Sequence, residues 1–130
     1  MQILAVDGGD QSLASQFAQL RDAGYEVTQA GTFESARRIL LDASQHIDVL
    51  VTNLRLQAYN GLHLVSYTRS LSSYTAAIVV DRETDRVAEL EARRFGAGYV
   101  SAQDAPQVLA ELVEAALHEP RASASAPHVV

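Results

Sequence analysis

The chain alternates short apolar runs with longer amphipathic stretches, and it completes this alternation five times. Continuous apolar runs, such as "DVLVTN" at residues 48–53 and "AAIVVD" at 76–81, are typical of strands covered on both faces. The stretches between the runs repeat apolar residues at spacings of three and four, which is the pattern of a helix packed along one side. Strands separated by helices predict a parallel sheet with right-handed crossovers.

Five apolar runs are read as strands and five amphipathic stretches as helices. The predicted strands are residues 3–6, 25–30, 47–53, 76–81 and 98–102. The predicted helices are residues 11–23, 32–43, 61–72, 83–95 and 105–118. In the charged helix 83–95, we expect Val87, Leu90 and Phe95 to form the apolar side that packs against the rest of the domain.

The length of 130 residues favours one domain, which we place at residues 1–118 because the alternation ends there. Residues 119–130, "EPRASASAPHVV", carry no periodic apolar face. We therefore read them as a disordered tail or a linker.

The charged residues and the missing residue types exclude several functions. Formal net charge is −6 and no basic stripe is visible, which argues against direct binding of nucleic acid. The chain has no cysteine, and this excludes disulfides and thiolate catalysis. No apolar run reaches the ~20 residues that a membrane span needs, and no signal peptide is visible, so we expect a cytoplasmic location. All ten basic residues are arginine, because lysine is absent.

Polar or small residues stand where four of the predicted strands end. They are Asp7-Gly8, Asn53, Asp81 and Ser101-Ala102. In an open parallel sheet, the loops after the carboxyl ends of the strands converge, and ligands bind there. Any site in this domain is therefore expected to be built from these residues.

The sequence resembles a known family along residues 1–118. The segments that carry the resemblance are "ILAVDGG", "RDAGYEV", "DVLVTNLRL" with the later "NGL", and "FGAGYVSA". Their order and spacing resemble those of receiver domains of two-component response regulators. The resemblance implies a flavodoxin-like (βα)5 three-layer α/β sandwich whose five parallel strands have the order 2-1-3-4-5.

The resemblance also implies a phosphorylation site, and each residue of that site has a chemical role. An aspartate that ends the third strand accepts a phosphoryl group from a histidine kinase, because the nucleophile must be an ionised carboxylate. Two acidic residues after the first strand help to hold Mg²⁺, a cation that prefers oxygen ligands. A Thr or Ser after the fourth strand and a Lys after the fifth contact the phosphoryl oxygens.

This chain departs from the family at most of these positions. Asn53 stands where the phosphoacceptor is expected, and an amide oxygen is a poor nucleophile. Asp7 matches the first acidic position, but Gly8 replaces the second. Asp81 replaces the Thr or Ser, and Ala102 stands at the lysine position. We interpret the site as a degenerate phosphorylation pocket, and we expect neither catalysis nor a cofactor.

On this reading we do not expect Mg²⁺ to bind, and its only candidate ligands at the strand ends are Asp7 and Asp81. The alternative is that one of these two carboxylates pairs with Arg55 or Arg82. The four histidines share no metal-ligand spacing.

The function that remains is protein binding without phosphorylation, as a pseudo-receiver. By resemblance, the candidate interface is the face of the fourth helix, fifth strand and fifth helix, with Arg86, Glu89, Arg93 and Tyr99, and the partner is another protein or a second copy. Glu89 and Arg93 are also spaced to pair within one helix. By resemblance, Tyr99 stands at the position of the family's switch aromatic. The Thr or Ser hydroxyl that triggers this aromatic in the family is missing here. Alternatively, Tyr99 is a half-buried aromatic residue of the sheet.

A second reading is a flavodoxin-like domain that binds a nucleotide or another small ligand. "DGGDQS" at residues 7–12 is glycine-rich and precedes a helix, an arrangement able to cradle a phosphate. The segment matches neither the P-loop nor the dinucleotide fingerprint, and its two carboxylates would repel phosphate.

Overall fold

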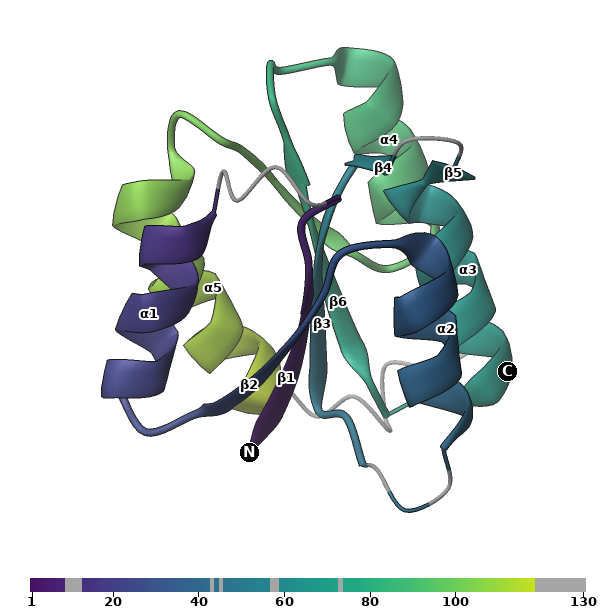
Figure 1. The fold of residues 1–130 in the computed structure, drawn as a ribbon. Helices are drawn as coiled ribbons and strands as arrows, with labels where there is room; N and C mark the ends of the chain where they lie inside the picture. The colour runs from purple at the N-terminus through teal and green to yellow at the C-terminus, as the bar shows by residue number, and fades with distance from the viewer. Residues whose placement is uncertain (9–12, 43, 45, 57–58, 73, 119–130) are drawn as a thin grey trace.

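A parallel five-stranded sheet runs through the middle of the computed structural model, with helices on both faces (Figure 1). The structure describes residues 1–8, 13–42, 44, 46–56, 59–72 and 74–118, so the predicted tail 119–130 lies outside the described residues. The strands of the sheet are β1 (Gln2–Val6), β2 (Glu26–Ala30), β3 (Val49–Asn53), β6 (Ala76–Asp81) and β7 (Gly98–Ser101). Their spatial order is β2-β1-β3-β6-β7, which is the predicted 2-1-3-4-5 when only these strands are counted.

In the described part of the chain, five helices cover the sheet in two layers, as the three-layer prediction requires. They are α1 (Ala14–Asp22), α2 (Phe33–Leu41), α3 (Gly61–Leu71), α4 (Arg86–Arg94) and α5 (Ala105–His118). Helices α1 and α5 lie on one face, and α2, α3 and α4 lie on the other (Figure 1). None of the helices in the described ranges combines the length and the apolar character that crossing a membrane would require.

The core consists of two apolar clusters, one on each face of the sheet. Neighbouring strand residues alternate between them: Leu50 belongs to the cluster under α2, α3 and α4, and Val51 to the cluster under α1 and α5. Both are fully buried. The central strands are thus apolar on both faces, which explains why their sequences are continuous apolar runs.

Helix α4 corrects the sequence prediction for residues 83–95. It begins only at Arg86, because the Asp85 side chain caps it by accepting hydrogen bonds from the backbone N–H groups of Val87 and Ala88. The helix buries Ala88 and Ala92, four residues apart, whose small side chains allow close packing. The predicted apolar side lies outside instead: Val87 is 70% exposed and Leu90 48% exposed, and Phe95 follows the helix at 36%.

The connection from β3 to α3 contains a feature that the sequence analysis did not predict. Two short strands, β4 (Arg55–Leu56) and β5 (Tyr59–Asn60), pair antiparallel beside the main sheet. The Asn60 side chain then accepts a hydrogen bond from Leu62 N at 2.6 Å and caps α3. This connection leads the chain directly from the end of β3 into α3, so it sets the position of the residues at that strand end.

Candidate functional site

The carboxyl ends of β1, β3, β6 and β7 meet at one edge of the sheet, as their parallel pairing dictates. The register places Asp81 beside Ser101 and Asn53 beside Val80. The sequence-predicted site residues therefore lie at this edge, and their contacts show what each of them does.

Asn53 is half-buried and joins the end of β3 to the end of β1. Its Nδ2 donates a hydrogen bond to the backbone oxygen of Asp7 at 3.0 Å. Gly61, the first residue of α3, lies directly against it: a Cβ on Gly61 would come within 2.3 Å of the Asn53 carbonyl oxygen. The amide at the phosphoacceptor position thus has a structural role, and the close approach of α3 requires a glycine.

Asp7 and Gly8 form the turn that follows β1. Asp7 is buried, at 6% exposure, and its backbone N–H donates to the Ala30 carbonyl oxygen at 3.3 Å. Gly8 has a φ of 70°, and a Cβ there would lie 3.3 Å from the Arg55 carbonyl oxygen. A side chain at position 8 is therefore strained by the backbone and crowded by the chain after β3. The backbone conformation at Gly8 is poorly suited to the second carboxylate of a magnesium site.

Asp81 is a fully buried carboxyl group at the end of β6. Its Oδ2 accepts a hydrogen bond from the Tyr99 hydroxyl at 2.5 Å. Its Oδ1 is buried without a hydrogen-bond partner in the described part of the chain, and no arginine there forms an ion pair with it. Asp81 is therefore not the carboxylate of the expected pair with Arg55 or Arg82, because its hydrogen-bond partner is a phenol.

Tyr99 is half-buried on β7 and its hydroxyl is held on two sides. It donates to Asp81, as above, and it accepts from the backbone N–H of Asp85 at 3.0 Å. Burial and the hydrogen bond with Asp81 raise the pKa of Tyr99 to about 12. The phenol therefore stays protonated, and remains a donor, at every physiological pH.

The pair of Asp81 and Tyr99 was not predicted from the sequence, although the sequence contains a signal for it. Tyr99 is registered with Val79, so Asp81 lies two residues further along the neighbouring strand and on the same face. Such diagonal neighbours are within reach of an aromatic side chain. Charge alone suggests arginine as the partner of a carboxylate, whereas strand alternation identifies the phenol.

Ala102, at the lysine position, contributes only its backbone and a small apolar side chain. Its N–H donates to the Asp81 carbonyl oxygen at 2.6 Å, and its side chain packs against the cluster under α1 and α5. Within the described residues, no group of three or more His, Asp or Glu side chains is arranged to hold a metal ion. Most of "DGGDQS", which the nucleotide reading depends on, lies outside the described residues.

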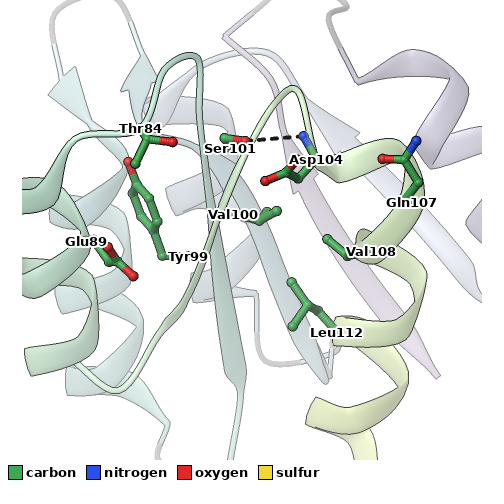
Figure 2. Close-up of a pocket in the computed structure, with 9 residues that line it drawn as sticks. All are labelled: Thr84, Glu89, Tyr99, Val100, Ser101, Asp104, Gln107, Val108 and Leu112. Carbon is green, nitrogen blue, oxygen red and sulfur yellow. Dashed lines mark hydrogen bonds between the residues drawn. The ribbon is translucent and has the colours of Figure 1, made fainter.

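Two of the candidate interface residues, Glu89 and Tyr99, line a cavity of about 440 Å³ between α4, β7 and α5 (Figure 2). Its lining residues are Thr84, Glu89, Tyr99, Val100, Ser101, Asp104, Gln107, Val108 and Leu112. Thr84, Ser101 and Asp104 lie toward the top of this view, and Glu89 lies lower, on the side formed by α4. Val108 and Leu112 line the side formed by α5. Arg86 is exposed, and Arg93 pairs with Glu89 at 2.8 Å within α4, as the spacing allowed.

Comparisons with known proteins give one consistent fold. No protein-family model matches the sequence, and no curated protein matches it. Solved structures match along most of their length. The chemotaxis response regulator CheY4 of Vibrio cholerae is 25% identical, with a TM-score of 0.77 over 89% of this chain and 98% of that one. A two-component response regulator from Clostridium difficile is 18% identical, with a TM-score of 0.80 over 92% and 97%.

The response regulator TrrA from Thermotoga maritima, solved in complex with Mg²⁺–BeF, is 21% identical, with a TM-score of 0.77 over 89% of this chain and 98% of that one. The sheet order, the two helical layers and these neighbours together define the class: the chain has the flavodoxin-like fold of response regulator receiver domains.

Proposed function

We propose that this chain is a cytoplasmic, non-enzymatic interaction module of two-component signalling that binds its partner without being phosphorylated. The observation that carries the proposal is the hydrogen bond from Asn53 Nδ2 to the Asp7 carbonyl oxygen. The group at the phosphoacceptor position is an amide that ties two strand ends together, and it offers no carboxylate for phosphoryl transfer.

The charges around Asn53 support the same proposal. Asp81 places a buried carboxylate at the position where the family has a hydroxyl donor, and like charge disfavours a phosphoryl group. The position of the family's lysine holds Ala102, and the chain has no lysine elsewhere to take its place. A phosphoryl group at this edge would meet an added negative charge and lack its fixed positive charge.

The face formed by α4, β7 and α5 is the proposed contact surface. It combines the cavity of Figure 2 with the exposed Val87 and Leu90 on the outer side of α4. Exposed apolar side chains beside arginines and glutamates fit a surface that binds a protein, since interfaces join an apolar centre to a polar rim. The partner is a signalling protein or a second copy of this chain.

Intact-mass measurement after incubation with acetyl phosphate and Mg²⁺ tests the loss of phosphorylation. We expect no added phosphoryl group on the wild type. Asn53→Asp is the matched variant, and we expect it to stay unmodified too, because Gly8, Asp81 and Ala102 remain unsuited to the chemistry. A stoichiometric gain of one phosphoryl group by the wild type would refute the proposal, and a gain by Asn53→Asp alone would show that only the acceptor was lost.

Charge reversals on α4 test the contact surface. Glu89→Arg and Arg93→Glu each break the ion pair within the helix, whereas the double swap keeps a pair and reverses its direction. We expect all three to weaken dimerisation in sedimentation, or capture of the partner. The exposed pair Glu34 and Arg37 on α2, swapped in the same way, is the control. Unchanged binding by the α4 variants would place the contact elsewhere.

A further inference from the structure

The Tyr99 hydroxyl is the meeting point of three segments that are separate in the sequence. It comes from β7, donates to Asp81 at the end of β6, and accepts from the backbone N–H of Asp85 immediately before α4. The carbonyl oxygen of Glu83 lies 3.4 Å from the same hydroxyl. One phenol therefore connects the edge strand, its neighbour and the loop between β6 and α4.

The loop that Tyr99 contacts has little else to hold it. Residues 82–85 are all exposed. The described hydrogen bonds that fix this loop to the sheet converge on Tyr99. Asp85 continues the connection into α4, because its Oδ1 accepts from Val87 N at 2.9 Å and from Ala88 N at 3.3 Å. The phenol is thus connected, through Asp85, to the first turn of α4.

Asp81 disfavours conformations in which Tyr99 moves away from β6. The carboxyl group is fully buried, and the Tyr99 hydroxyl is the one hydrogen-bond partner that the described chain gives it. A buried carboxylate with no partner is far more costly than one with a strong charge-assisted bond. Movement of Tyr99 away from β6 would leave both oxygens unsatisfied, so the alternative position of the aromatic is strongly disfavoured.

We propose that Asp81 and Tyr99 form an internal clasp that holds the aromatic side chain, residues 82–85 and the first turn of α4 in one conformation. The wall of the cavity formed by Thr84, Glu89 and Tyr99 is then set by a carboxylate of the chain itself, and no ligand at the sheet edge is needed to set it (Figure 2). The clasp is a property of the fold and is independent of which partner, if any, this face binds. The raised pKa of Tyr99 is consistent with it, because burial and the hydrogen bond to Asp81 favour the protonated phenol.

Amide hydrogen exchange measured by NMR tests the clasp directly in Tyr99→Phe. The amides of Val87 and Ala88 keep their acceptor on Asp85 in this variant, so faster exchange there reports release of the loop and not the loss of their own bond. We expect at least a tenfold acceleration at both amides. The capped amides Ser35 and Leu62, at the starts of α2 and α3, are internal controls that we expect to be unchanged. Unchanged exchange at Val87 and Ala88 would overturn the proposal.

A second variant keeps the proposal testable if Tyr99→Phe folds poorly. The double substitution Asp81→Val and Tyr99→Phe removes both buried polar groups, so no carboxylate is left unpaired. We expect its melting temperature to exceed that of Tyr99→Phe alone, while Val87 and Ala88 still exchange at least tenfold faster than in the wild type. Slow exchange at these amides in the double variant would show that packing, not the clasp, holds the loop. Tyr74→Phe, at an exposed tyrosine, is the control for the substitution itself.

Discussion

The raised pKa of Tyr99 predicts a specific loss of stability at high pH. The folded protein holds this pKa at about 12, against an ordinary value of 10.0 in the unfolded chain. A group whose pKa is raised by folding contributes stability that is fully present below the unfolded value. Between pH 10 and 12 the unfolded chain releases a proton that the folded chain retains, so the free energy of unfolding falls as the pH rises.

The size of the effect follows from the same two values. A shift of one pKa unit corresponds to about 1.4 kcal/mol, so two units set an upper limit of about 2.7 kcal/mol. Tyr99 is half-buried, and water at the ring reduces the electrostatic part of this difference. We therefore expect a loss of about 1–2 kcal/mol between pH 10 and pH 12 that depends on the hydroxyl of Tyr99.

The composition of this chain removes one competing titration from the measurement. Lysine ammonium groups normally titrate in this range, but the chain has none. Urea unfolding of the wild type and of Tyr99→Phe at intervals from pH 9 to pH 12 gives two curves, and their difference cancels the four other tyrosines. We expect the free energy of unfolding of the wild type to fall toward that of the variant across this interval. Parallel curves would refute the assignment of the raised pKa to the pair with Asp81.

Two further predictions concern positions where the structure differs from a simple reading of the sequence. Gly61→Ala forces a Cβ against the Asn53 carbonyl oxygen and is expected to lower the free energy of unfolding by about 3 kcal/mol, measured by urea denaturation. Gly98→Ala, whose Cβ meets only ordinary contacts, is the control. On α4, Val87→Asn is expected to change stability by less than about 0.5 kcal/mol, whereas Ala88→Leu is expected to cost about 1–3 kcal/mol. A larger loss of stability for Val87→Asn than for Ala88→Leu would show that Val87 faces the core, as the sequence predicted.

The fold could be predicted because the pattern that specifies it is local. Each buried strand is a continuous apolar run, since both of its faces are covered, and the intervening helices show their own spacing. The rotation of α4 was predicted wrongly because the larger side chains, Val87 and Leu90, were assumed to face the core. Alanines at 88 and 92 fill that role, and apolar periodicity does not reveal when small residues pack more closely than large ones.

The site could be predicted in part. The end of each strand was correctly expected to bring Asp7, Asn53 and Asp81 to one edge of the sheet, because parallel strands align their carboxyl ends. The left-handed conformation of Gly8 and the hydrogen bond between Asp81 and Tyr99 needed the register of the strands and the path of the loops. Such contacts depend on residues distant in the sequence, so a strand-by-strand reading does not contain them.

Asn53 and Asp81 both differ from the residues that the resemblance implies at their positions, and one explanation accounts for both. On the proposed clasp, the carboxylate of Asp81 holds Tyr99, so the aromatic would not respond to a phosphoryl group even if one were present. Once Tyr99 is held, an aspartate at position 53 would add an unused negative charge at an edge that already contains Asp7 and Asp81. An amide there avoids the repulsion and donates to the Asp7 carbonyl oxygen instead. The clasp and the amide are therefore compatible with each other at this edge of the sheet.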